Sequence, residues 1–123
     1  MFVINEDLSI NITRGDIAAF SVGAKAGEAN YEFKVGDVIR FKVFTKKDCE
    51  DVVLQKDFTV TEPTEMVGIT LEGEDTTIGE VISKPVDYWY EVELNPDTLP
   101  QTIIGYDENG AKVFKLYPEG GEA

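Results

Sequence analysis

Histidine is absent from this 123-residue chain, and cysteine occurs only once, at Cys49. Without histidine there is no Ser-His or Cys-His nucleophilic pair and no imidazole general base. A single cysteine cannot form an intrachain disulfide, and without histidine it cannot complete the usual zinc sites. We therefore predict a protein that is not an enzyme, with no catalytic residues, no cofactor and no metal site.

Basic side chains are also scarce: 11 lysines and arginines stand against 24 aspartates and glutamates, a net charge of −13. Clustered Lys and Arg bind the phosphates of nucleic acids and anionic membranes, so we expect neither as a partner. Carboxylates alone can form a catalytic pair. Most of them, such as Glu72, Glu74 and Asp75, fall in predicted turns or at outward strand positions, which is typical of a solvated acidic surface.

Long apolar segments are missing as well, because no run approaches the roughly 20 residues that span a bilayer. The first residues, Met-Phe-Val-Ile-Asn-Glu-Asp, lack the basic region and long apolar stretch of a secretory signal. We therefore expect no signal peptide, and synthesis and folding in the cytoplasm. The lone cysteine is compatible with such a reducing compartment.

Alternating apolar and polar residues, the pattern of half-buried strands, recur along the chain. The pattern predicts strands over residues 8–12, 17–22, 38–45, 52–60, 67–71 and 87–94, and two more within 101–116. Residues 23–30 are expected to form a loop, 31–35 a short edge element and 75–83 a short helical turn.

These strands predict an all-β fold, an immunoglobulin-like antiparallel β-sandwich of about seven or eight strands. A partly closed barrel is the alternative architecture. The apolar fraction of 42% supports a packed core. We expect residues 1–123 to form a single domain, with an acidic, flexible tail from about residue 118.

Aromatic residues gather in the segment 87–94. One set of large side chains shares a parity and is predicted to face the core: Tyr88, Tyr90, Val92 and Leu94. Trp89 has the opposite parity, and is the aromatic that we expect at the surface as a candidate interaction residue. Packing of Trp89 in the core or against a second sheet is the structural alternative. A sugar-stacking platform is the other functional hypothesis, for the group Tyr88, Trp89, Tyr90 and Tyr106.

Three shorter features have structural interpretations. Asn109-Gly110 stands between two alternating runs and predicts a β-hairpin. The same segment, 107–110, has some likeness to a calcium-binding loop, but it lacks the spaced oxygen ligands of such a loop. Arg14-Gly15-Asp16 is the integrin-recognition tripeptide by letter, but we interpret it as a turn that leads into a strand. Lys56 interrupts the apolar parity of 52–60, and is expected to extend toward solvent or to mark a bulge.

Four motifs follow one another along the chain: Thr13-Arg14-Gly15-Asp16, then Gly36 through Val43, then Glu74-Asp75-Thr76, then Asp87 through Leu94. Their layout resembles small proteins of Gram-positive bacteriophages and prophages. It is similar to the immunoglobulin-like N-terminal domain of phage baseplate upper proteins, which hold receptor-binding proteins on the baseplate. This chain lacks the helical extension of those proteins, so the resemblance implies a standalone accessory or structural subunit.

The resemblance implies a non-enzymatic phage or prophage structural protein, associated with the tail or baseplate. It would be made in the bacterial cytoplasm and reside in the virion. Its expected partners are other phage structural proteins and further copies of the same chain. Two alternatives stay open. The charge of −13 suits an acidic, DNA-mimicking inhibitor of a host protein, and the aromatic group suits a carbohydrate-binding module.

Overall fold

The computed structural model describes residues 1–48, 50–105 and 110–119, which contain eleven β-strands and one short helix. The strands are β1 (Phe2–Ile4), β2 (Ile10–Thr13), β3 (Ala18–Val22), β4 (Lys25–Ala26), β5 (Ala29–Asn30), β6 (Val38–Phe44), β7 (Val52–Thr59), β8 (Val67–Leu71), β9 (Val86–Leu94), β10 (Gln101–Ile104) and β11 (Lys112–Tyr117). The single helical turn, α1 (Gly73–Thr76), follows β8. The predicted all-β sandwich class is confirmed.

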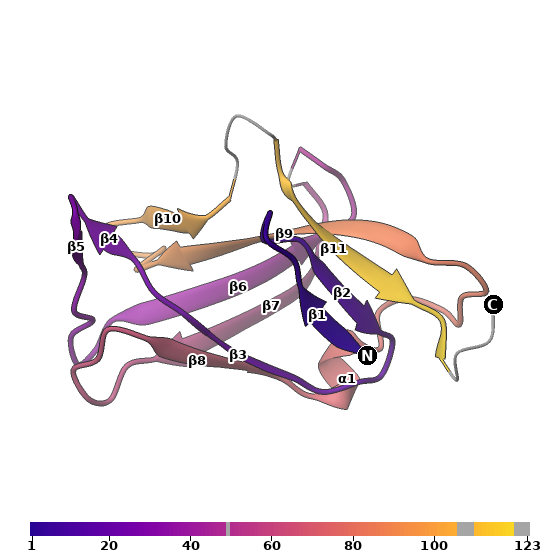
Figure 1. Cartoon of the computed structure of the whole chain (residues 1–123), viewed down its shortest axis with the longest axis horizontal. Coiled ribbons are helices and arrows are strands. Elements are labelled where there is room, and N and C mark those ends of the chain that lie inside the picture. Colours follow the sequence, from indigo (N-terminus) through magenta and orange to yellow (C-terminus); the bar gives the residue numbers. More distant parts are fainter. Residues whose placement is uncertain (49, 106–109, 120–123) are drawn as a thin grey trace.

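Seven strands form one large sheet in the order β1-β2-β11-β9-β6-β7, with β10 also paired to β9 (Figure 1). Neighbouring strands are antiparallel except β2 and β11, which run parallel with Ile10 opposite Phe114. β9 is the central strand, because β6 occupies one of its edges while β11 and β10 share the other. This central position explains why the inward side chains of β9 are so uniformly apolar.

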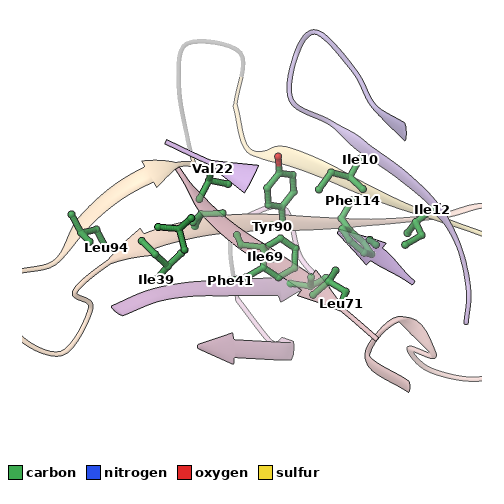
Figure 2. Close-up of a cluster of buried hydrophobic side chains, with 14 of the residues drawn as sticks. Ile10, Ile12, Val22, Ile39, Phe41, Ile69, Leu71, Tyr90, Leu94 and Phe114 are labelled. Atoms are coloured by element: carbon green, nitrogen blue, oxygen red, sulfur yellow. The ribbon is translucent and has the colours of Figure 1, made fainter. Parts of the chain in front are cut away.

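A smaller layer, the antiparallel pair β3 and β8, packs across one face of the large sheet (Figures 1 and 2). The side chains between the layers are fully buried and mostly branched or aromatic: Ile10, Ile12, Ile39, Phe41, Val43, Ile69, Leu71, Val92, Phe114 and Leu116. The centroid of the Phe41 ring lies 5.5 Å from the ring centroid of Tyr90, 6.1 Å from that of Phe20 and 6.2 Å from that of Phe114. Burial of this apolar surface is the main stabilising contribution to the sandwich.

Most predicted strands are present close to their expected ends, as β2, β3, β6, β7, β8 and β9 show. Three short strands are additional: β1, and the pair β4 and β5, which form a hairpin where we expected a loop. Of the edge element expected at 31–35, one isolated bridge is present, between Phe33 and Thr64. The expected helical turn begins earlier, at Gly73, because the Asp75 carboxylate accepts a 2.8 Å hydrogen bond from the Glu72 N–H.

In the described residues, the two runs that flank Asn109-Gly110 pair with β9 rather than with each other. β10 pairs with the end of β9 near Leu94, and β11 pairs with its beginning near Val86, both antiparallel. The two runs are successive segments on one edge of β9, and β9 forms its hairpin with β10. Asn109 itself, and residues 107–108 of the calcium-loop alternative, lie outside the described residues.

Arg14 is buried, with 8% of its side chain exposed, and bridges three parts of the chain. Its Nε donates to the Ile78 carbonyl at 3.1 Å, its Nη2 donates to the Gly79 carbonyl at 2.6 Å, and its Nη1 contacts the Glu119 carboxylate. At the start of the tail expected from about 118, Pro118 is buried and Glu119 is paired with Arg14, and residues 120–123 lie outside the described residues.

The tripeptide Arg14-Gly15-Asp16 forms a turn, as we interpreted it. Gly15 has a φ of +88°, which favours glycine, and the Asp16 carboxylate pairs with the N-terminal ammonium. The buried guanidinium of Arg14 is turned into the fold, so the tripeptide is not displayed as a recognition loop.

Lys56 lies on β7, an outer strand of the large sheet, at a position directly opposite Phe41. Its Nζ lies 2.5 Å from an Asp75 carboxylate oxygen of α1, so the side chain ends in an ion pair rather than in open solvent. The strand has no bulge at Lys56. The irregularity in this pairing lies further along, where Val43 is opposite Leu54 and Phe44 is opposite Val52, so that Val53 is the extra residue. An inward-pointing charge on an edge strand disfavours pairing with another protein's strand.

We expect the Lys56→Ile variant to self-associate more than the wild-type protein at equal concentration, because β7 then presents an apolar edge. Sedimentation velocity over a concentration series measures this directly. The Asp75→Asn variant is the matched control, because it breaks the same ion pair but keeps the lysine, and should add no association. Equal sedimentation of Lys56→Ile and wild type at all concentrations would contradict the protective role of Lys56.

Candidate interaction surface

The face of the large sheet that points away from β3 and β8, termed the outer face, carries charged and aromatic side chains in register. Pairing of the strands places these residues there: Arg40, Lys42, Phe44, Asp57, Trp89, Glu91, Glu93, Val113 and Lys115. Side chains alternate along each strand, so these residues lie on the opposite side from the buried Phe41, Tyr90 and Phe114.

Trp89 lies on this outer face, opposite Phe44 of β6 and Val113 of β11. Residues in register on neighbouring strands point the same way, so the three side chains form an apolar cluster, termed the Trp89 patch. Phe44 is 2% exposed, and the Lys42 ammonium lies 5.8 Å from the centroid of its ring. Trp89 is half-buried, and so less exposed than we expected, because large neighbours flank it on both sides.

The remaining aromatic residues of β9 belong to the opposite face. Tyr90, Val92 and Leu94 are buried as predicted, and Tyr88 is half-buried against the same cluster. The Tyr90 hydroxyl donates to the Leu8 carbonyl, and burial raises the pKa of this phenol. Tyr88 and Tyr90 therefore do not share a stacking platform with Trp89; Tyr106, like Cys49, lies outside the described residues.

Arg40 fixes one end of the outer face. Its Nε and Nη2 donate to the two carboxylate oxygens of Asp57 at 2.8 and 2.9 Å, a bidentate pair. Its Nη1 and Nη2 also donate to Asp97, in the turn after β9, at 3.3 and 3.0 Å. The hydrogen bonds from Arg40 lower the pKa of Asp57. This network holds the β9–β10 turn against β6 and β7.

Lys42 lies between two glutamates of β9. Its ammonium is 2.6 Å from Oε1 of Glu93 and 3.7 Å from Oε1 of Glu91. The contact with Glu93 is an ion pair rather than an aligned hydrogen bond, and Oε1 is shielded from solvent. The three side chains are only 16–20% exposed. Burial, followed by the neighbouring charge of Glu93, raises the pKa of Glu91.

We expect Glu91→Gln to stabilise the protein at pH 7, by about 0.5 kcal/mol. Because the pKa of Glu91 is raised on folding, ionising this group costs stability. The cost is absent below the unfolded pKa of about 4.3, and fully present above the folded pKa. The gain in the variant should therefore disappear as the pH falls toward 4 in urea unfolding titrations.

Glu93→Gln is the matched control for this measurement. It removes the carboxylate closest to Lys42, at 2.6 Å, and should destabilise the protein at pH 7. A loss of stability in both variants at pH 7 would contradict the unequal roles of the two glutamates.

In Figure 1, β10 and the β4–β5 hairpin lie at the same end of the sandwich. A groove opens there. It has a volume of about 860 Å³ and several apolar lining residues: Ala24, Ala26, Tyr31, Met66, Leu94 and Ile103. Our sequence reasoning missed it, because it predicted a loop for residues 23–30 and paired β10 with the wrong strand. The small residues of that loop, Gly23, Ala24 and Ala26, were the available signal.

The wall of the groove around Gly23 is closely packed. A Cβ atom at Gly23 would lie 2.8 Å from the Met66 sulfur and 3.2 Å from the Glu65 carbonyl oxygen. The Thr64 hydroxyl accepts a 3.2 Å hydrogen bond from the Met66 N–H and donates one of 2.9 Å to the Met66 carbonyl. The backbone here is held in place, while the Met66 side chain is 53% exposed and of an adaptable type.

Within residues 1–48, 50–105 and 110–119, no group of three or more His, Cys, Asp or Glu side chains is placed to hold a metal ion. In the same part of the chain, no helix has the length and apolar character needed to cross a membrane. The close carboxylates, Glu91 and Glu93, share Lys42 on the outer face and do not line the groove.

Comparisons with models of protein families, with curated proteins and with solved structures find no match to this chain.

Proposed function

We propose that the protein is a non-enzymatic structural component of a phage or prophage of Gram-positive bacteria, associated with the tail or baseplate. It binds other phage structural proteins through its outer face. The observation that carries this proposal is the Trp89 patch, in which an aromatic side chain stands among apolar neighbours and fixed ion pairs. Tryptophan surrounded by such neighbours is the usual composition of the energetic centre of a protein interface.

The strand order supports the same proposal. In immunoglobulin-like sandwiches, strands C, F and G are neighbours in one sheet, and strands B and E lie in the other. Here β6, β9 and β11 follow one another in that way, and β3 pairs with β8 in the facing layer. This arrangement fits the immunoglobulin-like sandwich that the motifs led us to expect, although a fold alone does not define a function.

The test is incorporation of the Trp89→Ala variant into phage particles, measured by mass spectrometry of purified virions. We expect the variant to fold normally but to be at least about 10-fold depleted, as for an interface residue worth about 2 kcal/mol. Lys115→Gln, which changes an exposed charge on the same face, is the control and should be incorporated normally. Normal incorporation of Trp89→Ala, or glycan binding that depends on Trp89, would overturn the proposed contact.

A further inference from the structure

The groove at the end of the sandwich is bounded by two strand edges. On one side lie Gln101, Thr102 and Ile103 of β10, and on the other lies the segment 23–26, which includes β4. Among the described strands, β10 pairs only with β9, and β4 only with β5. Beside β11, by contrast, the large sheet continues through β2 and β1. The sheet therefore has a notch next to β10.

The backbone of Thr102 faces this notch. At the end of β9, the Asn95 N–H donates to the Val38 carbonyl of β6. Because the backbone groups of successive residues point to opposite edges of a strand, the odd-numbered residues of β9 bond to β6 here. The even-numbered residues turn their N–H and C=O groups toward β10. Leu94 is opposite Gln101, and Glu93 is opposite Thr102. By this alternation Gln101 bonds to β9, and Thr102 turns its N–H and C=O away from β9.

The opposite wall also has a residue whose backbone groups point away from its paired strand. Ala26 and Ala29 flank the two-residue turn of the β4–β5 hairpin, and the Tyr31 N–H donates to the Ala24 carbonyl at 2.9 Å. The residue between these bonded positions is Lys25, which lines the groove. By the same alternation, Lys25 turns its backbone N–H and C=O away from β5.

The charge of the chain identifies the chemistry of the groove's partner. The groove itself is lined by one lysine, Lys25, and one glutamate, Glu65, so its attraction for a charged partner comes from the charge of the chain as a whole. The whole chain has a net charge of −13, so a second copy of the same chain is repelled, whereas a basic segment is attracted. The apolar lining at Met66 and Ile103 suits apolar side chains that point inward from every second residue of a strand.

We propose that the groove is a strand-addition site for an extended, basic segment of a partner protein. The segment pairs its main chain with β10 at Thr102, places alternate apolar side chains toward Met66 and Ile103, and carries Lys or Arg at its ends. Main-chain hydrogen bonds provide affinity in this mode of binding, and the pockets for alternate side chains provide specificity. The inference rests on the proposed function in one respect, that the chain acts through contacts with proteins.

The test is selection of binding peptides from a displayed library of random ten-residue sequences on the immobilised wild-type protein. We expect the enriched peptides to alternate apolar with polar residues and to carry Lys or Arg at their ends. Thr102→Pro removes the N–H that faces the notch, and should weaken binding of the enriched peptides by about 10-fold, the worth of one main-chain hydrogen bond. Thr102→Val keeps the N–H and should bind as the wild-type protein does.

A chemical control guards against misfolding of the proline variant, although proline is tolerated on an edge strand where the N–H faces outward. A selected peptide with one N-methylated residue at a pairing position should lose affinity for the wild-type protein to a similar extent. Failure to enrich any peptide, enrichment of acidic peptides, or equal affinity for the methylated peptide would overturn the proposal.

The two proposals fail separately. Trp89→Ala should bind the selected peptides as the wild-type protein does, because Trp89 does not line the groove. Absence of the protein from virions would remove the phage role while peptide binding at Thr102 stands. Peptide binding that is lost in Trp89→Ala but kept in Thr102→Pro would place recognition on the outer face and overturn the strand-addition site.

Discussion

Phe41→Ala is expected to lower the free energy of unfolding by about 3–5 kcal/mol, the largest effect of a single core substitution in this protein. The Phe41 side chain is completely buried, and its ring contacts those of Phe20, Tyr90 and Phe114 from both layers of the sandwich. Truncation leaves a cavity between the layers that the surrounding strands can close only in part. Domains of this size have a free energy of unfolding of only about 5–15 kcal/mol, so the substitution removes a large part of the stability of the protein.

Urea unfolding followed by Trp89 fluorescence measures the change, with Phe41→Leu as the control. Leucine refills most of the volume, so we expect its cost to be about 1–1.5 kcal/mol. A loss below about 1 kcal/mol for Phe41→Ala would contradict the central position of this ring in the core.

Arg14→Ala is expected to cost about 2–4 kcal/mol, the second large effect. The guanidinium donates to the carbonyls of Ile78 and Gly79, which lose their donors in the variant. It also joins the end of β2 to the segment after α1 and to Glu119. Because Arg14 is 8% exposed, water cannot readily replace these hydrogen bonds.

Two controls separate the contributions of Arg14. Glu119→Gln removes only the ion pair, whose acidic partner is 50% exposed, and should cost less than about 1 kcal/mol. Arg14→Lys keeps the charge but not the planar fork of donors, so we expect it to recover less than half of the loss. Thermal unfolding of the four proteins in parallel provides the comparison. Equal losses in Glu119→Gln and Arg14→Ala would contradict the importance of the two carbonyl contacts.

The strand pattern was predictable because burial imposes a period of two on each strand. The inward residues Tyr90, Val92 and Leu94, and the outward parity of Trp89, follow from that period alone. Lys56 was recognisable as an exception, but its partner Asp75 was not, because α1 comes near β7 only after the chain has folded.

Pairing was harder to predict than strand content. The Asn109-Gly110 signal is local, whereas the partner of each strand is decided by long-range competition for the edges of β9. Both β10 and β11 find their partner in β9, and β11 also pairs with β2 in parallel. A short-range turn motif carries no information about such contacts.

The two candidate surfaces also differed in how far the local sequence pattern predicts them. Trp89 could be selected from parity, but its flanking residues, Phe44 and Val113, come from strands distant in sequence. The small residues of 23–26 alone do not locate the groove, because its walls are formed by strand edges, and these are known only when the order of strands is known. Arg14 is the opposite case. The tripeptide Arg14-Gly15-Asp16 matches a surface recognition motif, but Arg14 is buried in the fold, where it donates to two carbonyls 64 and 65 residues away.

We propose that this protein is a part of a phage particle, held there by contacts with other structural proteins. The most direct measurement is the number of copies per virion, counted with isotope-labelled peptides in particles purified on a density gradient. We expect a fixed ratio to the major tail or baseplate proteins, retained after high-salt washing. Absence of the chain from purified particles, with the protein recovered only in the soluble lysate, would contradict it.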